Sequence, residues 1–405
     1  MELLGEVLAQ GKTKWVHQHL RNPDWALLIA KDDITAGDGA KHDVIPDKGR
    51  IATRTTCNVF RFLKACQIPV AFEMQGGDDW FIAPKCNMLP YEVVTRREAH
   101  GSSLKRAPHL SKGHIFPQLV VEFFLKTSGR RWKEHELPCD DPLMIHDAAA
   151  HLIRLYNPAK PLAGQEPFLV LNEAEVFTVA REDALMNEMA RLARQTFFVL
   201  EKAWQLENRR LVDMKVEFGT DPFGKLLLAD VVDNDSWRVV EDGAYIDKQV
   251  YRDGGDLSDV TRKYQLVAEL TSHFALPRQR VILWTDPRGT GIGDKLIEAI
   301  DKRSQLSIPS IIVRDSMNGT TSDAMLKLIT LTHEVPDTVV LFDLNVDPEY
   351  REALSCVISA PVINCIYTHR AITEALNILA VHNPLQYMLA RVSLEAGLPG
   401  NVAVG

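Results

Sequence analysis

The chain has 405 residues, of which 46% are apolar and 25% are charged, and its formal net charge is −8. This length suits two or three domains, and the composition is that of an ordinary globular protein. The acidic balance argues against a general nucleic-acid-binding protein, whose binding face is basic. No run of about 18 apolar residues is present, which argues against a transmembrane helix.

The N-terminal segment and the cysteines indicate the cellular compartment. The first 14 residues lack the basic start and the long apolar core of a signal peptide. The six cysteines show no paired metal-binding spacing, and in a chain of this length we expect them to be reduced thiols. We therefore expect a cytoplasmic protein without membrane contact.

Two strands are predicted near the N-terminus, over residues 7–16 and 25–34. The first contains Gly11, Lys12, Thr13 and Lys14, which do not form a Walker loop because the upstream glycine of that motif is missing. A glycine flanked by lysines can still let the backbone approach a triphosphate, with the ammonium groups as point charges. A solvated lysine pair is the alternative interpretation.

The next segments predict a helix and a possible anion site. Residues 49–68 show helical periodicity, and a new strand is expected from residue 68. Residues 92–106 read as a strand followed by a Gly-Ser turn. There Arg96 could make bidentate contacts and Ser102 and Ser103 could donate hydrogen bonds to an anion. An ordinary surface loop is the alternative.

One further strand and two further helices are predicted on either side of residues 211–238. Residues 119–126 predict a strand that ends at Lys126, and residues 183–205 predict a long amphipathic helix backing a central sheet. Residues 257–274 predict a second helix, followed by a linker over residues 276–280.

Residues 211–238 read as a hairpin. Apolar residues alternate with Asp213, Lys215 and Glu217, so one face of the first strand carries these three charges. Turn residues follow, and the second apolar run, which contains Asp230, forms the returning strand of the hairpin. Two carboxylates beside a lysine suit a divalent cation that is bridged to phosphate oxygens.

The register of this hairpin decides whether Glu217 and Asp230 meet. With a symmetric five-residue loop Asp230 falls on the wrong face, whereas an even-length turn or a bulge places it opposite Lys215 or Asp213. The metal interpretation therefore requires such a turn or bulge. The alternative is a solvated edge hairpin with scattered charges.

From residue 281 onward the pattern changes to alternating strands and helices. Apolar runs predict strands at 280–286, 310–315, 338–345 and 361–366, and helices are expected at 292–302, 322–332, 348–356 and 370–379. Buried strands joined by crossover helices predict a small parallel α/β domain.

These motifs carry a resemblance to a known family. The runs LVDMKVEFG and LADVVDNDSWR closely resemble SAICAR synthetase, the purine-pathway ligase that joins aspartate to a carboxylated aminoimidazole ribotide. The family signature Glu-Gly-Lys-Thr-Lys is matched except that Gln10 replaces its first residue, and Arg96 and Ser102 keep the family's spacing. The arrangement as a whole resembles the bifunctional form, which is fused to an aminoimidazole ribotide carboxylase domain.

The resemblance implies an α/β protein with two domains. Residues 1–275 would form the two-lobed α+β ATP-binding domain, with lobes of about 1–88 and 89–255 followed by a connecting helix. Residues 280–405 would form a three-layer parallel-sheet domain like the carboxylase. The implied reaction is ATP-dependent amide formation from carboxyaminoimidazole ribotide (CAIR) and L-aspartate, with Mg²⁺ as the metal.

Site residues are implied for each part of this reaction. The resemblance assigns Mg²⁺ to Glu217 and Asp230, and catalysis to these two residues with Lys215. It places ATP against Lys12, Thr13, Lys14, Met88 and Lys126, although residues 127–138 form an insertion that the family lacks. It places the other substrates against Arg96, Gly101, Ser102, Ser103, Asp213, Asp235, Arg238, Lys248 and Arg252.

The carboxylase motifs do not survive in the second domain. Residues 285–291 replace the family's Gly-Ser-x-Ser-Asp loop, Ser316, Met317 and Asn318 replace its Ser-Ala-His, and residues 343–349 replace its glycine-rich segment. We expect a non-catalytic module for homo-oligomer assembly or regulation. The alternatives are a bifunctional enzyme with carboxylase activity, a small-molecule kinase, or a non-catalytic regulatory relative with the same nucleotide cleft.

Overall fold

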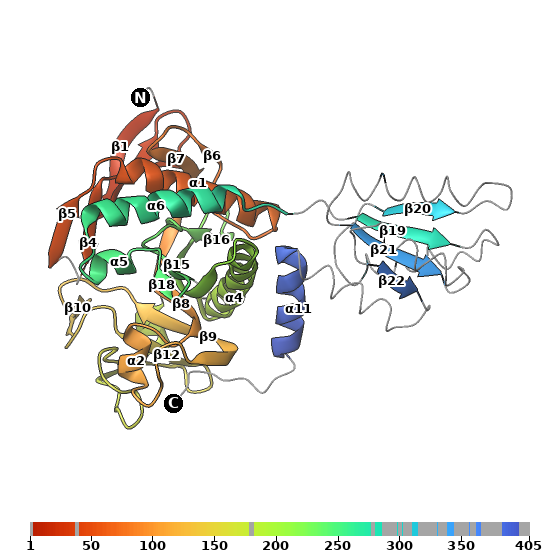
Figure 1. Ribbon diagram of the computed structural model, residues 1–405. Coiled ribbons are helices and arrows are strands. Elements are labelled where there is room, and N and C mark those ends of the chain that lie inside the picture. The colour runs from red at the N-terminus through yellow and green to blue at the C-terminus, as the bar shows by residue number, and fades with distance from the viewer. Residues whose placement is uncertain are drawn as a thin grey trace. The chain divides into compact units, whose positions relative to one another are not determined.

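The chain divides into two compact units (Figure 1). The computed structural model describes residues 3–36, 40–177 and 182–276, then residues 280–285, 310–314, 338–343, 362–365 and 383–396, and residues 298, 302, 330 and 356. The first unit comprises Met1–Ala275 with Glu395–Gly405, and the second comprises Leu276–Leu394. Within the described residues, no helix combines the length and the apolar character needed to cross a membrane.

In the described part of the first unit, the N-terminal residues build a five-stranded antiparallel sheet. Its order is β1 (Leu4–Gln10), β2 (Lys14–His19), β3 (Trp25–Ala30), β7 (Trp80–Pro84), β6 (Met74–Gln75). A separate hairpin follows β3, with β4 (Asp33–Ala36) and β5 (Lys41–Val44). The expectation of two strands over residues 7–36 is therefore wrong. A tight turn, in which the Gly11 N–H donates to Lys14 O at 2.9 Å, divides the first predicted strand.

Two helices pack together beside this sheet. Helix α1 (Lys48–Ala65) lies along α6 (Leu257–Ser272), as Figure 1 shows, and both helices were predicted. The strand expected from residue 68 is wrong, because Val70 makes only an isolated bridge to Leu228. Pro69 has no N–H to donate to a ladder.

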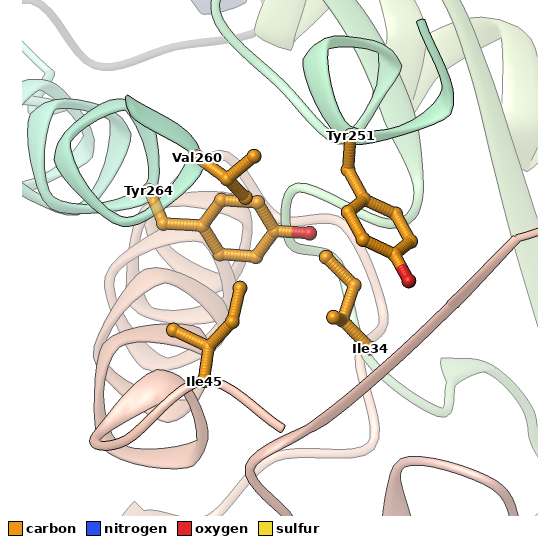
Figure 2. Packing of buried hydrophobic residues seen from close by; sticks show 5 residues of the cluster. All are labelled: Ile34, Ile45, Tyr251, Val260 and Tyr264. Atoms are coloured by element: carbon orange, nitrogen blue, oxygen red, sulfur yellow. The ribbon is translucent and has the colours of Figure 1, made fainter. Parts of the chain in front are cut away.

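A buried cluster joins these helices to the β4–β5 hairpin. Ile34 and Ile45 pack against Tyr251 of α5 (Gln249–Arg252) and against Val260 and Tyr264 of α6 (Figure 2). Each of these side chains is at most 4% exposed. The cluster therefore holds two parts of the chain that are more than 200 residues apart, as in the hydrogen bond from Tyr251 to Asp43.

The centre of the first unit is a larger sheet, with nine strands in the described residues. Eight follow the order β14-β13-β12-β9-β8-β15-β17-β18, and β16 pairs with β15. These strands are β8 (Asn87–Glu98), β9 (Ile115–Leu125), β12 (Leu143–Asp147), β13 (Leu152–Tyr156), β14 (Leu169–Asn172), β15 (Arg210–Thr220), β16 (Leu226–Ala229), β17 (Trp237–Glu241) and β18 (Ala244–Tyr245).

Helix α4 (Glu182–Leu206) contacts β8, β9 and β15 of this sheet. This confirms the predicted long amphipathic helix over residues 183–205. The short elements are α2 (Ser102–Arg106), α3 (Glu173–Val176), and the hairpin of β10 (Arg131–Trp132) and β11 (His135–Glu136), which lies within the insertion after Lys126.

Strand β15 is central, with β8 on one side and β17 and β16 on the other. The alternative of a solvated edge hairpin is therefore wrong. In the pairing with β8, Asp213 lies opposite Arg96, Lys215 opposite Val94 and Glu217 opposite Glu92. Residues with this two-residue spacing share one face of the sheet, as the alternation predicted.

The second unit contains a parallel sheet. In its described residues the order is β20 (Ser310–Arg314), β19 (Arg280–Thr285), β21 (Thr338–Asp343), β22 (Val362–Cys365), and each neighbouring pair is parallel. The predicted parallel strands are confirmed. The helices predicted at 292–302, 322–332, 348–356 and 370–379 lie outside the described residues, apart from single positions. Helix α11 (Pro384–Ala396) follows β22 in the chain.

Candidate active site

A cavity of about 1150 Å³ opens in the first unit between residues of its five-stranded and nine-stranded sheets. Of the residues proposed from the sequence, fourteen line it: Lys12, Thr13, Lys14, Met88, Arg96, Lys126, Asp213, Lys215, Glu217, Asp230, Asp235, Arg238, Lys248 and Arg252. Gly101, Ser102 and Ser103 are not among the lining residues, but Gly101 lies against Arg238 and Ser102 contacts Arg96, which are. The fold therefore brings residues from seven separate segments of the sequence to one space.

Glu217 and Asp230 meet a group of lysines in this cavity. Lys126 Nζ lies 2.6 Å from Glu217 Oε2, and Lys215 Nζ lies 3.5 Å from Glu217 Oε1. Lys14 forms an ion pair with Asp230. Burial favours a higher pKa for Asp230, but Lys14, Lys215 and Lys126 outweigh burial and hold that pKa below its ordinary value. Asp230 is therefore an ionised carboxylate among these lysines.

The geometry that brings them together is not the one the sequence required. Thr220 pairs with Leu226, which leaves the odd-length loop 221–225 between β15 and β16. A continued ladder would place Asp230 opposite Val216, on the wrong face. The ladder instead ends at the Glu217–Ala229 pair, and Asp230 adopts φ 66°, a left-handed conformation that aspartate tolerates. The prediction that an even-length turn or a bulge brings Asp230 to the correct face was therefore wrong. The left-handed conformation of Asp230, just beyond the end of β16, does so instead.

A third carboxylate, Glu92, was missed from the sequence. Its Oε1 lies 2.6 Å from Lys215 Nζ, and it lines the same cavity. Burial lowers the pKa of Lys215, but Glu92 and Glu217 outweigh burial and raise it, so Lys215 is a fixed cation. The two-residue spacing from Glu92 to Val94 and Arg96 was the available signal, since it places Glu92 on the same strand face as the proposed Arg96.

Two arginines converge on one carboxylate at another part of the cavity. Arg96 Nη1 and Arg238 Nη1 donate to Asp213 Oδ2 at 2.8 and 2.6 Å. Arg96 Nε also donates to Glu122 Oε2 at 2.6 Å, and its Nη2 reaches Ser102 Oγ at 3.5 Å. These arginines are held in place by carboxylates and still border the open cavity, as a preformed anion site requires.

The Gly-Ser turn lies directly against this arginine pair. Gly101 has φ 55°, and a Cβ placed on it would lie 2.4 Å from Arg238 Nη2. Arg106, in the helix that follows this turn, is 5% exposed and donates from Nη2 to both oxygens of Glu122. The absence of a side chain at Gly101 lets the backbone turn and Arg238 approach each other.

Asp235 is held by three groups. Lys248 Nζ donates to Oδ2 at 2.8 Å, Tyr264 Oη donates to Oδ1 at 2.7 Å, and Lys48 Nζ lies 4.0 Å from Oδ2. Figure 2 shows the Tyr264 ring within its apolar cluster, with the hydroxyl pointing toward the side on which Ile34 and Tyr251 lie. Lys48 and Tyr264 were not identified from the sequence, because nothing in their local pattern distinguishes them from surface and core residues.

Asp233 is expected to make stability depend on pH. Burial and the neighbouring Asp235 raise the pKa of Asp233 to about 6. Since an unfolded Asp titrates near a pKa of about 3.9, the folded protein binds more protons from about pH 4 to 6. The stability that this group contributes is therefore present at low pH and is lost as the pH rises through about 6.

Asp233→Asn tests this expectation. The amide oxygen can still accept the Asp235 N–H, which lies 2.8 Å from the carboxylate. From pH 5 to pH 8 the variant should gain about 1 kcal/mol in unfolding free energy relative to the wild type. Urea unfolding at both pH values measures this difference, and a difference that is the same at pH 5 and pH 8 contradicts the assignment.

Comparisons with known proteins bear on the identity of this site. The sequence model of the family described as SAICAR synthetase matches residues 7–270. The phosphoribosylaminoimidazole-succinocarboxamide synthase of Chloroflexus aurantiacus is 40% identical over 281 residues, which cover 67% of this chain and 98% of that protein. The probable multifunctional protein ADE2 of Caenorhabditis elegans is 31% identical over 374 residues, 89% of this chain and 80% of that protein.

A bifunctional relative and a solved structure agree with these matches. The Drosophila melanogaster bifunctional phosphoribosylaminoimidazole carboxylase/phosphoribosylaminoimidazole succinocarboxamide synthetase is 37% identical over 66% of this chain and 57% of that protein. A structure described as SAICAR synthetase (Type-2) in complex with ADP aligns at 26% identity with a TM-score of 0.52, covering 66% of this chain and 97% of that one. The resemblance of the first unit to SAICAR synthetase is confirmed, and the chain belongs to the SAICAR synthetase family.

Proposed function

We propose that this protein joins L-aspartate to CAIR at the expense of ATP, giving SAICAR, ADP and phosphate. The observation that carries the proposal is the meeting of Glu217 and Asp230 with Lys14, Lys126 and Lys215 in one cavity. Alternating carboxylates and ammonium groups suit a metal-bound triphosphate, whose charge they can share. The family's named synthases support the choice of substrates.

The nucleotide would occupy the part of the cavity near the β1–β2 turn. Lys12, Thr13 and Lys14 border it there, and Met88, which is 43% exposed, offers an apolar surface for the base. Lys126 would neutralise phosphate charge after exchanging its present partner Glu217 for the nucleotide. The structure described in complex with ADP supports a nucleotide role for this fold.

The donor set fits Mg²⁺. Two carboxylate oxygen donors are what the ion commonly takes from a protein, with phosphate and water oxygens as its other ligands. Among the described residues no group of three histidine, cysteine or acidic side chains could hold a metal by itself, which agrees with an ion that arrives with the nucleotide. When bound, Mg²⁺ would supply charge neutralisation at the phosphates.

The chemistry proposed is a two-step acyl transfer. A carboxylate oxygen of CAIR attacks the γ-phosphorus, the bond to ADP breaks, and an acyl phosphate forms. The amine of aspartate then attacks the acyl carbon, phosphate leaves, and the nitrogen releases a proton. Lys215, held as a cation by Glu92, would stabilise the charge on the reacting carboxylate.

The remaining polar groups would bind and orient CAIR and L-aspartate. Arg96, Arg238 and Ser102 would hold the ribotide beside Asp213, and Gly101 and Ser103 would shape that turn. Asp235, Lys248 and Arg252 would complete the pocket at the end near α5. Holding the acyl phosphate and the amine together in this way supplies much of the rate enhancement.

We further propose that the second unit is a degenerate carboxylase-like module, which assembles the chain into a homo-oligomer or regulates it. The departures from the carboxylase motifs at residues 285–291, 316–318 and 343–349 support this proposal. All of them except Thr285 and Asp343 lie outside the described residues.

A coupled assay on the full chain tests the ligase. ADP release should depend on CAIR and on L-aspartate together, and the product should be the amide. A phosphorylated product formed without aspartate would favour a small-molecule kinase, and ATP binding without turnover would favour a regulatory relative. Conversion of aminoimidazole ribotide that depends on bicarbonate or carbon dioxide would contradict the loss of carboxylase activity.

A further inference from the structure

A buried histidine sits directly before the Gly-Ser turn and takes no part in the site described above. His100 is 4% exposed, and both of its ring nitrogens have partners. Nε2 lies 3.2 Å from Glu98 Oε2, and Nδ1 lies 2.6 Å from the Tyr245 hydroxyl. The two rings meet edge to face, with centroids 5.8 Å apart.

The partners fix the role of each nitrogen. Burial favours a higher pKa for Glu98, but His100 and Arg210 outweigh burial and hold that pKa below its ordinary value, so Glu98 is an ionised acceptor. Arg210 Nε also lies 2.8 Å from Glu98 Oε1. His100 Nε2–H must therefore donate to Glu98, and in the neutral ring Nδ1 then accepts the proton of the Tyr245 hydroxyl.

The imidazole thus connects two segments that border the arginine pair. Tyr245 lies on β18, whose partner strand β17 carries Arg238. On the other side, the His100 carbonyl accepts from Ser103 Oγ at 2.8 Å, which ties the start of α2 to His100. Gly101, between them, lies so close to Arg238 that a Cβ at this position would displace the guanidinium.

We propose that His100 is a positioning residue for the ribotide. Glu98 of β8 holds the imidazole ring, and the ring binds Tyr245 and so connects the Gly101–Ser103 turn to the β17–β18 hairpin. This connection sets the distance between Ser102 and Arg238 for substrate binding. This inference rests on the proposed function, because it assigns the ribotide to that end of the cavity. His100 touches no substrate itself and acts only through the turn.

Two variants test the fastening. Tyr245→Phe removes one hydroxyl and keeps the ring, and His100→Ala removes the whole connection. We expect the KM for CAIR to rise about five- to tenfold in Tyr245→Phe, the effect of one hydrogen bond, and on the order of 100-fold in His100→Ala. The KM for ATP should stay within about twofold, since the nucleotide residues lie on other segments. His100→Gln should recover part of the loss, because its amide N–H can donate to Glu98 and its amide oxygen can accept from the Tyr245 hydroxyl.

The matched control is Tyr91→Phe. Tyr91 lies on the same strand as Glu98 and donates its hydroxyl to Glu182, at the start of α4. Tyr91 precedes Glu92 by one residue and Arg96 by five, so its side chain lies on the opposite face of β8, away from the cavity. This variant loses a buried hydroxyl–carboxylate bond and should therefore lower the melting temperature without changing the KM for CAIR.

The outcomes separate this inference from the proposed function. An active wild type whose two variants keep the KM for CAIR within twofold overturns the inference alone. A parallel rise in the KM for ATP also overturns it, since that result indicates general loosening. If His100→Ala does not fold, Tyr245→Phe and His100→Gln decide. If the wild type does not convert CAIR, both the proposed function and this inference are contradicted.

Discussion

Glu217→Gln and Asp230→Asn are each expected to lower kcat on the order of a thousandfold or more, because each removes one negative charge that the bound metal–nucleotide complex needs. Both variants should fold. Each substituted side chain keeps one oxygen and a similar volume. The lysines that lose a carboxylate partner line an open cavity. Steady-state turnover with CAIR and aspartate, together with thermal unfolding, measures both effects.

The control for this pair is Glu201→Gln. Glu201 is also buried and ion-paired, with Arg97 Nε at 2.7 Å, but it lies on α4 against the opposite face of the central sheet. The Glu201→Gln variant should be less stable than the wild type and should have an unchanged kcat. A near-wild-type rate in either Glu217→Gln or Asp230→Asn would remove the metal assignment, and with it the observation on which the ligase proposal depends.

The second large effect is expected from a single methyl group. Gly101→Ala would place a Cβ 2.4 Å from Arg238 Nη2 and 2.9 Å from its Cζ, at a residue with φ 55°. Arg238 must then move away from the turn, and a displacement on the order of 1 Å at a binding site can cost about 100-fold in rate. We expect a rise of that size in the KM for CAIR, with little change in the KM for ATP.

Gly243→Ala separates displacement from backbone strain. Gly243 also has a left-handed φ, 85°, and lies in the turn that follows β17, but no atom lies within 4 Å of its Cβ position. A Cβ at either glycine brings backbone strain, and the strain is larger at Gly101, whose ψ of −125° lies outside the left-handed helical region. If the two variants show the same kinetics, close approach to Arg238 is not what Gly101 provides.

The sequence predicted the regular parts of this fold well, for a simple reason. Alternation over residues 211–219 and helical periodicity over 49–68, 183–205 and 257–274 record which side of an element is buried, and burial is a local property of the pattern. Prediction failed at two places: the turn at Gly11 divided one predicted strand, and Val70 forms only an isolated bridge where another strand was expected.

The charge pattern of residues 211–230, together with the resemblance to a known family, indicated most of the carboxylates, lysines and arginines that line the candidate site. Only the tertiary structure decided how they meet. The left-handed φ of Asp230 corrects an unfavourable register, and Glu92 reaches Lys215 across 123 residues of sequence. Tyr264 and His100 likewise gain their roles from partners on other elements, Asp235 and Tyr245. An ion pair or a buried hydrogen bond depends on distance in space, which a periodic pattern along the chain does not encode.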